Sequence, residues 1–531
     1  MSAEAIEAGR TALGIELGST RIKACLVDAE DPARVLAVGS HAWENRFEER
    51  TWTYALDDAW AGVQAAFAAL RDDVRAQHRA ELREIGAIGV SGMMHGYFAF
   101  DEAGELLAPF RTWRNTSTGR AAAELTEAFG VNIPLRWSIA HLHQAILDDE
   151  PHVPRVRSIT TLAGYVHRAL TGRAALGVGD ASGMFPLDAA GGDYDSALVA
   201  RYDELVAGRL PVASVAELLP TVLRAGEPAG ALTPAGALLL DPSGTLRPGV
   251  PLCAPEGDAG TGMVATNAVA PRTGNVSAGT SIFAMVVLER PLERVHAELD
   301  LVATPAGDPV AMVHCNNGAS ELAAWAHVFA RFAEAAGAPI DDDAVFDALF
   351  REALAGEADA GGLLAYNHVA GEPIAGLDEG RPLLVRTPES RLTLANLMRA
   401  HLYGAFGTLA LGMRVLDEEG VRLDRMFAHG GMFRTAGVAQ RFLAGALDAP
   451  VSVGETASEG GAWGIAVLAA FARAAAGGDA RDLSDYLDEV VFAGAAQSTV
   501  EPVPDDVAGF AAYLERYRAG LAVEAAAVAA L

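Results

Sequence analysis

Three places in this chain of 531 residues combine glycine with small neighbours in a way that could hold phosphate. One lies in GIELGSTRIKACLVD, residues 14–28, and one in GNVSAGTSIFAMVV, residues 274–287, where a small-residue turn separates two apolar runs in each case. The third follows the apolar segment at 426–429. Small residues let backbone amides and hydroxyls approach phosphate oxygens, although ordinary tight turns have the same composition. The residues concerned are Gly18, Ser19, Thr20, Gly279, Thr280, Ser281, Gly430 and Gly431.

Two charged residues accompany the first of these turns. Glu16 precedes it, and Lys23, which follows it, is the only lysine in the chain. A compact ammonium near phosphate is not equivalent to a guanidinium, so Lys23 is a candidate phosphate contact. An Ala- and Arg-rich composition typical of GC-rich coding also explains a single lysine, and a solvated strand residue is the alternative interpretation.

Asp258 is the strongest candidate for a proton acceptor. It stands in EGDAGTG, residues 256–262, after an apolar segment and inside a glycine-rich turn. A carboxylate placed there could accept a proton from a substrate hydroxyl. Glu256 and Glu16 are further candidates for this role. The alternative is that Asp258 only caps the following helix.

Two other segments carry side chains that suit a small polar ligand. TWRNT, residues 112–116, places Trp113, Arg114 and Asn115 together, and SGMMHGYFAFD, residues 91–101, places Met94 beside His95 at the end of a predicted strand. An aromatic ring among hydrogen-bonding groups would suit a sugar, and a packed loop would look the same. The pair His141 and His143 could bind a metal only with a third ligand, which the sequence does not identify.

Several classes of function are disfavoured by composition. The formal net charge of −29 argues against nucleic-acid binding and against docking on an anionic membrane. The P-loop pattern is absent and GDAGTG does not match GxGxxG, so a dinucleotide site gains little support. Three widely separated cysteines and the lack of a signal-peptide pattern predict a cytoplasmic location. No apolar run reaches the roughly 18 residues that a membrane span needs.

The predicted strands and helices that carry these residues indicate an α/β fold. Periodicity and turn residues predict hairpins at 13–27 and 274–287 and a short buried strand at 85–92. Asp57 or Asp58 would cap a helix over 57–83. Mixed strands and helices in both halves favour largely parallel sheets. Further helices are predicted over 117–129, 139–148, 320–336, 391–416 and 459–475, and a strand-turn-helix unit over 426–447.

Taken in order, these segments resemble the FGGY family of carbohydrate kinases, with likeness to its xylulokinase-like branch. GIELGSTRIKACLVD is similar to the first phosphate motif and TGNVSAGTS to the second, while IGVSGMMHGYFAFD resembles the Met-His-Gly turn. The remaining segments with family likeness are LTGRAALGVGDASGMFPLD, LPTVLRAGEPAGALTPAGA, VPLCAPEGDAGTGMVATNAV, FAHGGMFRTAGVAQRFLAGALDAPV and EGGAWGIAVLAA.

The resemblance implies two actin-like (ribonuclease H-like) domains with ATP and sugar in a cleft between them. Residues 1–265 would bind the sugar and supply Asp258 as the base, and residues 266–531 would bind the nucleotide. The reaction would move the γ-phosphoryl group of ATP to a sugar hydroxyl, with Mg²⁺ near Glu16 and Asp258. Substrate would meet Met94, His95, Trp113, Arg114, Asn115 and Asp258. The phosphates and adenosine would meet the glycine-rich turns named above, together with Lys23.

The chain departs from the family pattern at three places. Glu16 stands where the family has aspartate, so its role near Mg²⁺ is altered or water-mediated. In the Trp-Asn-Asp-x-Arg region Asn115 replaces the aspartate, and the arginine is missing or moved to Arg114. Met432 and Phe433 replace the glycine-serine pair that is common after the adenosine glycines.

The resulting expectation is an ATP- and Mg²⁺-dependent kinase for a small ketose, with a pentulose such as xylulose or ribulose as first choice. The Met94–His95 turn favours the xylulokinase-like branch. Another ketose, a polyol or glycerol is the alternative acceptor, and a homodimer is a further expectation. A catalytically weakened sugar or ATP sensor and an actin-like ATPase without a sugar are the rival functions.

Overall fold

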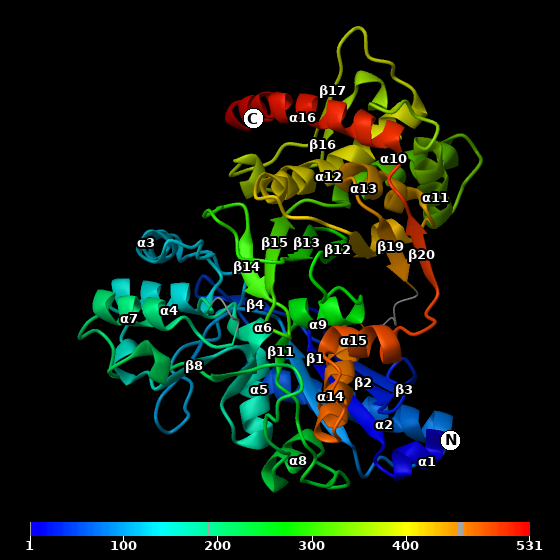
Figure 1. Ribbon diagram of the computed structural model, residues 1–531. Helices are drawn as coiled ribbons and strands as arrows, with labels where there is room; N and C mark the ends of the chain where they lie inside the picture. Colours follow the sequence, from blue (N-terminus) through cyan, green and yellow to red (C-terminus); the bar gives the residue numbers. More distant parts are fainter. Residues whose placement is uncertain (1, 189–191, 455–459) are drawn as a thin grey trace. The chain divides into compact units, whose positions relative to one another are not determined.

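The structure is a computed structural model that describes residues 2–188, 192–454 and 460–531. The chain forms two compact units (Figure 1). Unit 1 comprises Met1–Ala270, Leu301–Val310 and Thr456–Gly494. Unit 2 comprises Pro271–Asp300, Ala311–Glu455 and Ala495–Leu531. The units are therefore discontinuous in sequence, because two segments of the second half belong to unit 1. The division at residue 265 and the roles assigned to the two halves stay predictions.

Unit 1 is built on a sheet with the strand order β11-β6-β1-β2-β3. β1 pairs antiparallel with β2 and parallel with β6, which in turn pairs parallel with β11. The hairpin predicted at 13–27 is confirmed, but the expectation of largely parallel sheets is wrong. Strands joined by a tight turn are necessarily antiparallel, so each hairpin makes its sheet mixed. The strands are β1 (Thr11–Leu17), β2 (Arg21–Asp28), β3 (Val35–Ala42), β6 (Ala87–Gly92) and β11 (Glu256–Gly257).

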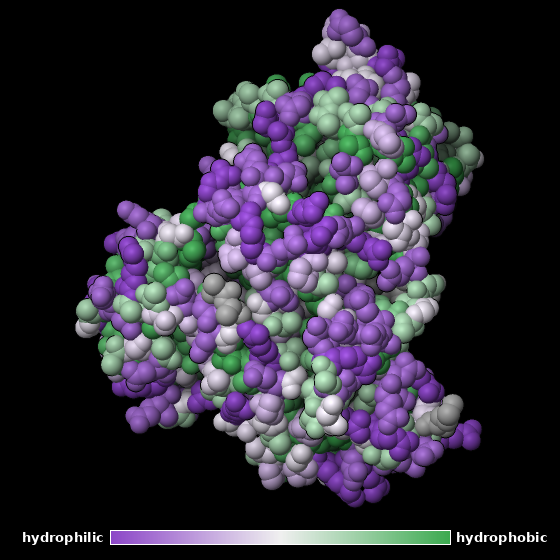
Figure 2. Space-filling model, in the orientation of Figure 1, coloured by the Kyte–Doolittle hydropathy of each residue, from purple (hydrophilic) through white to green (hydrophobic). Residues whose placement is uncertain are grey.

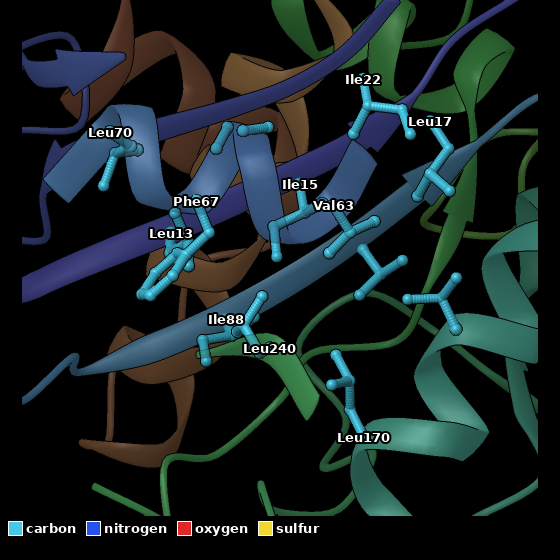
Figure 3. Packing of buried hydrophobic residues seen from close by; sticks show 14 of the residues in the cluster. Leu13, Ile15, Leu17, Ile22, Val63, Phe67, Leu70, Ile88, Leu170 and Leu240 are labelled. Atoms are coloured by element: carbon cyan, nitrogen blue, oxygen red, sulfur yellow. The ribbon is translucent and has the colours of Figure 1, made fainter. Parts of the chain in front are cut away.

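Alternate residues of β1 face two different helices. Leu13, Ile15 and Leu17 are buried in one apolar cluster with Val63 and Phe67 of α2 (Leu56–His78) (Figure 3). The intervening residues face the opposite side, because side chains alternate along a strand. α2 begins at Leu56 after Ala55, without a capping side chain. The prediction that Asp57 or Asp58 is the N-cap is therefore wrong; both lie in the first turn, where they favour the helix dipole.

The opposite side of β1 is covered by α14 (Gly461–Ala476), which explains why this late segment belongs to unit 1. A Cβ on Gly14 would lie 2.0 Å from the carbonyl oxygen of Ala462. Glycine is required there because strand and helix backbones approach closely. The helix predicted over 459–475 is confirmed from 461 onward, and residue 459 lies outside the described residues.

The helices predicted over 117–129 and 139–148 are confirmed as α3 and α4, and α2 ends earlier than expected, at His78, whereas the sequence did not predict α1, α5, α6, α7 and α15. The remaining elements are α1 (Ser2–Glu7), α3 (Gly119–Phe129), α4 (Ser138–Leu147), α5 (Leu162–Thr171), α6 (Val178–Ala181), α7 (Ser196–Leu205), α8 (Pro234–Leu240), α9 (Asp258–Ala265), α15 (Leu483–Tyr486), β4 (Arg46–Glu48), β5 (Thr51–Thr53), β7 (Phe98–Phe100), β8 (Ser158–Thr160), β9 (Ala175–Gly177) and β10 (Thr221–Leu223).

Unit 2 repeats the hairpin arrangement, as predicted. β12 pairs antiparallel with β13 and parallel with β18, in a sheet of order β14-β15-β13-β12-β18-β19-β20 among the described residues. Helices α12, α13 and α16 pack against one another. The elements of this sheet and of unit 2 are β12 (Thr273–Ala278), β13 (Ile282–Val287), β14 (Asp300–Ala303, of which residues 301–303 are assigned to unit 1), β15 (Pro309–Cys315), β16 (Leu364–Tyr366), β17 (Leu383–Val385), β18 (Arg425–His429), β19 (Val451–Gly454), β20 (Gln497–Val500), α10 (Ser320–Ala335), α11 (Asp342–Ala353), α12 (Leu394–Glu418), α13 (Val438–Leu447) and α16 (Pro504–Ala530).

The surface is predominantly polar on the face shown in Figure 2, with small apolar patches between the charged residues. This agrees with the net charge of −29. Within the described part of the chain, no helix combines the length and the apolar character that crossing a membrane requires.

Candidate active site

The ends of three neighbouring strands bring the predicted residues of unit 1 together. Ser91 of β6 is the register partner of Glu16 in β1 and of Glu256 in β11. Because these three strands are parallel, the segments that follow them leave the same edge of the sheet. The first phosphate turn follows β1, Met94 follows β6, and Asp258 follows β11.

Asp258 is the first residue of α9, and Gly257 is its N-cap. Its carboxylate Oδ1 accepts a hydrogen bond of 3.1 Å from the backbone amide of Met94. Loss of hydration among the surrounding protein atoms raises the pKa of Asp258, and hydrogen bonds from the backbone amides of Met94 and Ala259 oppose this rise. The residue is exposed at its surface, so water screens the effect, and the two amides favour the ionised form. The group therefore has the geometry of a proton acceptor.

Two further carboxyl groups lie buried behind Asp258. Burial and the charge of Asp180 raise the pKa of Glu256 to about 8, against hydrogen bonds from three backbone amides. Burial and the charge of Asp258 raise the pKa of Asp180 to about 7, against a hydrogen bond from Thr161. Asp180 was not among the predicted site residues, although it stands in the quoted segment with family likeness, GDASGM. The sequence suggests Glu256 only as a candidate base, a role that its exposure of 1% disfavours.

Glu16 points away from the α2 core toward α14. A Cβ on Gly461, at the start of α14, would lie 2.3 Å from Glu16 Oε1, so glycine leaves the room that the longer side chain needs. A carboxylate is also stabilised at a helix N-terminus. Lys23 is the register partner of Glu16 across the hairpin, and both are half-buried. The departure from aspartate at position 16 thus has a structural counterpart at Gly461.

The two predicted phosphate turns are alike, but the second is one residue shorter. Gly18 donates to the carbonyl of Arg21 at 3.0 Å, and Gly279 donates to that of Ser281 at 3.0 Å. Neither glycine has a positive φ, so the turn does not demand glycine for its conformation. The absence of a side chain instead leaves the backbone accessible. The second turn is further held by Gly318, which donates to Thr280 at 2.7 Å.

Gly430 lies beside the second turn within unit 2. It has a φ of 110°, which only glycine adopts readily, and a Cβ there would lie 2.3 Å from the carbonyl oxygen of Ala278. Gly431 is exposed, with nothing within 4 Å of its Cβ position. Met432 and Phe433, the departures from the family, are buried and anchor the segment. The second phosphate turn and the two predicted adenosine glycines are therefore neighbours.

The Met94–His95 turn is tightly packed. His95 has a φ of 69° and is 5% exposed, and its Nδ1 lies 3.4 Å from the carbonyl oxygen of Gly183. A Cβ on Gly183 would lie 2.5 Å from that nitrogen, so glycine is required for the close approach. Direct contact of this turn with a sugar stays a prediction.

Asn115 ties its own loop to β5 through its side-chain amide. Its Oδ1 accepts from the Trp52 amide at 2.8 Å, and its Nδ2 donates to the carbonyl oxygens of Trp52 at 2.8 Å and Thr112 at 3.0 Å. Both amide protons are therefore already used within the protein. This explains asparagine in place of aspartate, because a carboxylate could not donate. To donate a hydrogen bond to a sugar, the NH2 group of the Asn115 side-chain amide would have to give up one of these bonds.

Arg114 and Trp113 remain more accessible. The Arg114 guanidinium lies 4.6 Å from the ring centroid of Trp52 and 5.7 Å from that of Trp113, and Trp113 is 37% exposed. Sequence reasoning missed Trp52, which no local pattern connects to residues 112–116. The pair His141 and His143 is buried in α4, and His143 Nε2 lies 3.3 Å from Glu124.

Replacing Asn115 with aspartate is expected to lower the free energy of unfolding by about 1–3 kcal/mol, because the carboxylate would face two carbonyl oxygens without a donor. Urea unfolding of the purified variant measures this loss. Ser117→Asp, which adds the same charge at an exposed position of the same loop, is the control and should change stability little. Equal stability of Asn115→Asp and the natural protein would contradict the role of the amide as a donor.

The predicted residues thus fall into two sets. Unit 1 holds Glu16, Gly18, Ser19, Thr20, Lys23, Met94, His95, Trp113, Arg114, Asn115 and Asp258, and unit 2 holds Gly279, Thr280, Ser281, Gly430 and Gly431. No cluster of three or more His, Cys, Asp or Glu residues suited to a metal occurs in the described ranges. Mg²⁺ is commonly bound by one or two carboxylates together with substrate phosphates, so Glu16 and Asp258 have the donor chemistry for it.

Two models of one protein family match most of the chain. Residues 11–265 match the N-terminal domain and residues 274–473 the C-terminal domain of the FGGY family of carbohydrate kinases. Xylulose kinase of Escherichia coli (strain K12) is 24% identical over 300 residues, which cover 54% of this chain and 57% of that protein. The chain thus matches little more than half the length of this curated relative.

Solved structures show the same fold. A xylulose kinase from Rhodospirillum rubrum superposes with a TM-score of 0.77 at 20% identity, covering 97% of this chain and 99% of that one. A gluconate kinase from Lactobacillus acidophilus superposes with a TM-score of 0.74 at 17% identity, covering 97% and 99%. The predicted α/β class with two actin-like domains is confirmed. Because the chain matches both domains of the family, it belongs to the FGGY family of carbohydrate kinases.

Proposed function

We propose that the protein transfers the γ-phosphoryl group of ATP to a hydroxyl of a small ketose, with a pentulose such as xylulose or ribulose as the first candidate. The observation that carries the proposal is the position of Asp258. Its carboxylate stands at the end of a sheet strand, exposed, and is oriented by the Met94 amide at 3.1 Å. Family membership and the likeness to a xylulose kinase support the choice of reaction and acceptor.

Asp258 acts as the base in this reaction. It accepts the proton of the sugar hydroxyl while that oxygen forms a bond to the γ-phosphorus, and the bond from the γ-phosphorus to the β,γ-bridging oxygen breaks to release ADP. The Met94 amide keeps Oδ1 in place, so one carboxylate oxygen is held and the other remains available. Positioning of this kind supplies much of the rate enhancement in phosphoryl transfer.

The glycine-rich turns bind the nucleotide. Backbone amides and hydroxyls of Gly18–Thr20 and Gly279–Ser281 donate to phosphate oxygens, and Gly430 and Gly431 lie against the adenosine. Mg²⁺, when bound by Glu16 and Asp258, supplies positive charge to the phosphates, which this acidic chain otherwise lacks. Lys23, opposite Glu16 in the hairpin, adds a second positive charge near them.

An acceptor panel tests the proposal. Purified protein with ATP and Mg²⁺ is expected to release ADP only when an acceptor is present, with a pentulose giving the highest kcat/KM among ketoses, polyols, glycerol and gluconate. A preference for a polyol, glycerol or gluconate would keep the kinase and replace the acceptor. ADP release without acceptor and without a phosphorylated product would support an ATPase, and binding without turnover would support a sensor. The cytoplasmic location and the homodimer stay predictions.

A further inference from the structure

Glu256 carries a buried carboxyl group that the proposed reaction does not use. It lies on β11 with 1% of its surface exposed. Its Oε1 accepts from the Gly179 amide at 3.2 Å, and its Oε2 accepts from the Asp180 amide at 2.9 Å. These amides belong to the first turn of α6, whose N-cap residue Gly177 has no capping side chain. Glu256 therefore caps α6 from a distant part of the chain.

The surroundings of Glu256 are shaped to admit this side chain. A Cβ on Gly177 would lie 2.1 Å from Oε1, and one on Gly179 would lie 2.6 Å from Oε2. Neither glycine has a positive φ, so the backbone conformation does not demand glycine at either position. A Cβ on Gly260 of α9 would lie 3.4 Å from Oε2. Glycines from β9, α6 and α9 thus leave room for one carboxylate.

Asp180 holds the same segment from the other side. Its Oδ2 accepts from the Thr161 hydroxyl at 2.6 Å. Its Oδ1 lies 3.3 Å from the Cβ position of Gly257, is buried, and has no hydrogen-bond partner among the described residues. Gly257 connects Glu256 to Asp258 in the chain. The strand end that carries Asp258 is therefore held by the two hydrogen bonds between Glu256 and α6, while Asp180 ties the same turn of α6 to Thr161, the N-cap of α5.

Burying an ionisable carboxyl group is unfavourable unless hydrogen bonds compensate for the lost hydration. An apolar residue at position 256 would avoid this cost, yet the chain keeps the carboxylate two residues before Asp258. We infer that Glu256 is a positioning residue for Asp258: by tying β11 to α6 it sets the angle at which the base faces the acceptor hydroxyl. This inference rests on the proposed function, in which Asp258 is the base.

Glu256→Gln tests it, because glutamine has nearly the same shape but only one accepting oxygen. Its amino group would face a backbone amide, so one of the two bonds to α6 would be lost. Since a misplacement of about 1 Å can reduce turnover roughly 10²-fold, we expect kcat to fall about 10²-fold. The KM for ATP is expected to stay within about twofold, because the glycine-rich turns are untouched.

A second measurement separates positioning from general stability. If Glu256 acts through Asp258, the double variant Glu256→Gln/Asp258→Asn should be no slower than Asp258→Asn alone, because the positioned group is already disabled. If Glu256 only stabilises the fold, the fold-reductions in kcat of the two single variants should instead multiply in the double variant.

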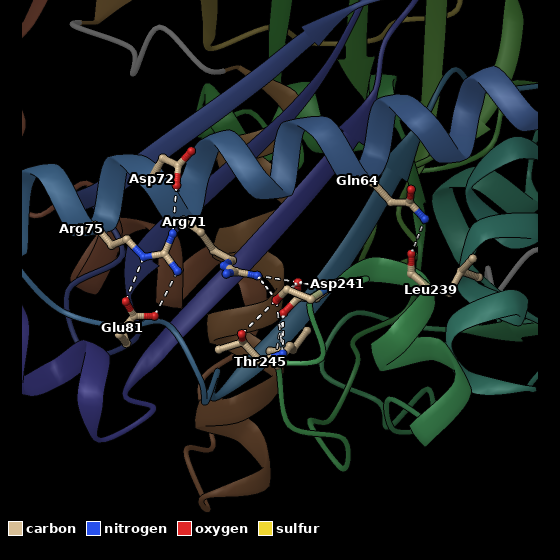
Figure 4. Close-up of polar contacts among 10 residues, drawn as sticks. Gln64, Arg71, Asp72, Arg75, Glu81, Leu239, Asp241 and Thr245 are labelled. Atoms are coloured by element: carbon tan, nitrogen blue, oxygen red, sulfur yellow. Dashed lines mark hydrogen bonds and ion pairs between the residues drawn. The ribbon is translucent and has the colours of Figure 1, made fainter.

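Asp241→Asn is the matched control (Figure 4). Asp241 is 3% exposed, accepts from the Thr245 amide at 3.1 Å and the Leu246 amide at 2.9 Å, and pairs with Arg71. It belongs to the same unit but contacts none of the proposed site residues. We expect this variant to lower the thermal midpoint while the folded protein keeps its kcat.

Three results would overturn the inference while leaving the kinase in place: a kcat of Glu256→Gln within threefold of the natural protein, a multiplicative double variant, or a Glu256→Gln protein that does not fold. A natural protein that phosphorylates no acceptor would overturn the proposed function itself, and this inference with it.

Discussion

Replacing Asp258 with asparagine is expected to reduce kcat about 10²–10⁴-fold, the contribution usual for a general base. Asparagine keeps an oxygen that can accept from the Met94 amide, so the strand end should remain in place. What it lacks is the capacity to take the proton of the acceptor hydroxyl. Steady-state ADP release in the presence of the preferred acceptor measures the loss.

Nucleotide binding by Asp258→Asn should persist, because the glycine-rich turns do not involve residue 258; calorimetric titration with ATP checks this. Asp101→Asn serves as the control. Asp101 also accepts backbone amides in unit 1, from Ala103 at 3.0 Å and Glu105 at 3.0 Å, in the loop that follows β7. Turnover that is unchanged in Asp258→Asn would remove Asp258 from the base role.

Replacing Gly14 with alanine is expected to destabilise unit 1 by more than about 3 kcal/mol, at or beyond the usual range for overpacking. A methyl group at this position would lie 2.0 Å from the carbonyl oxygen of Ala462 and 2.6 Å from the amide nitrogen of Ala466. Both atoms belong to the backbone of α14, so no rotation of a side chain can relieve the contact. The helix would have to move away from β1.

Thermal unfolding and the yield of folded protein measure the effect of Gly14→Ala. We also expect loss of activity, because α14 begins at Gly461, against which Glu16 lies. Gly119→Ala is the control, since nothing lies within 4 Å of its Cβ position at the start of α3. A Gly14→Ala protein as stable as this control would show that α14 is not packed against β1 as described.

The local parts of the site could be predicted from the sequence. Two apolar runs around a small-residue turn specify a hairpin through interactions between near neighbours, and both hairpins are confirmed. The position of Asp258 directly after a strand was readable for the same reason. Helix positions followed from apolar periodicity, whereas the N-cap of α2 did not, because capping depends on the exact backbone conformation at Ala55.

The roles of Asn115 and Glu256 could not be read locally. Each side chain hydrogen-bonds to backbone far away in the sequence, Asn115 to Trp52 and Glu256 to Gly179. Composition cannot show whether such a carboxyl or amide group is solvated, bound to a ligand or used inside the fold. From the sequence, Asn115 is therefore predicted only as a sugar contact, and Glu256 only as a candidate base.

The sequence by itself determined the hairpins, the run of helices and the order of segments that marks the FGGY family, because these depend on residues close together in the chain. Tertiary structure alone decided that Glu16, Ser91 and Glu256 lie in register across three strands and that α14 covers β1. The physical reason is that strand pairing and burial are contacts between distant segments, set by which surfaces fit together rather than by local preference.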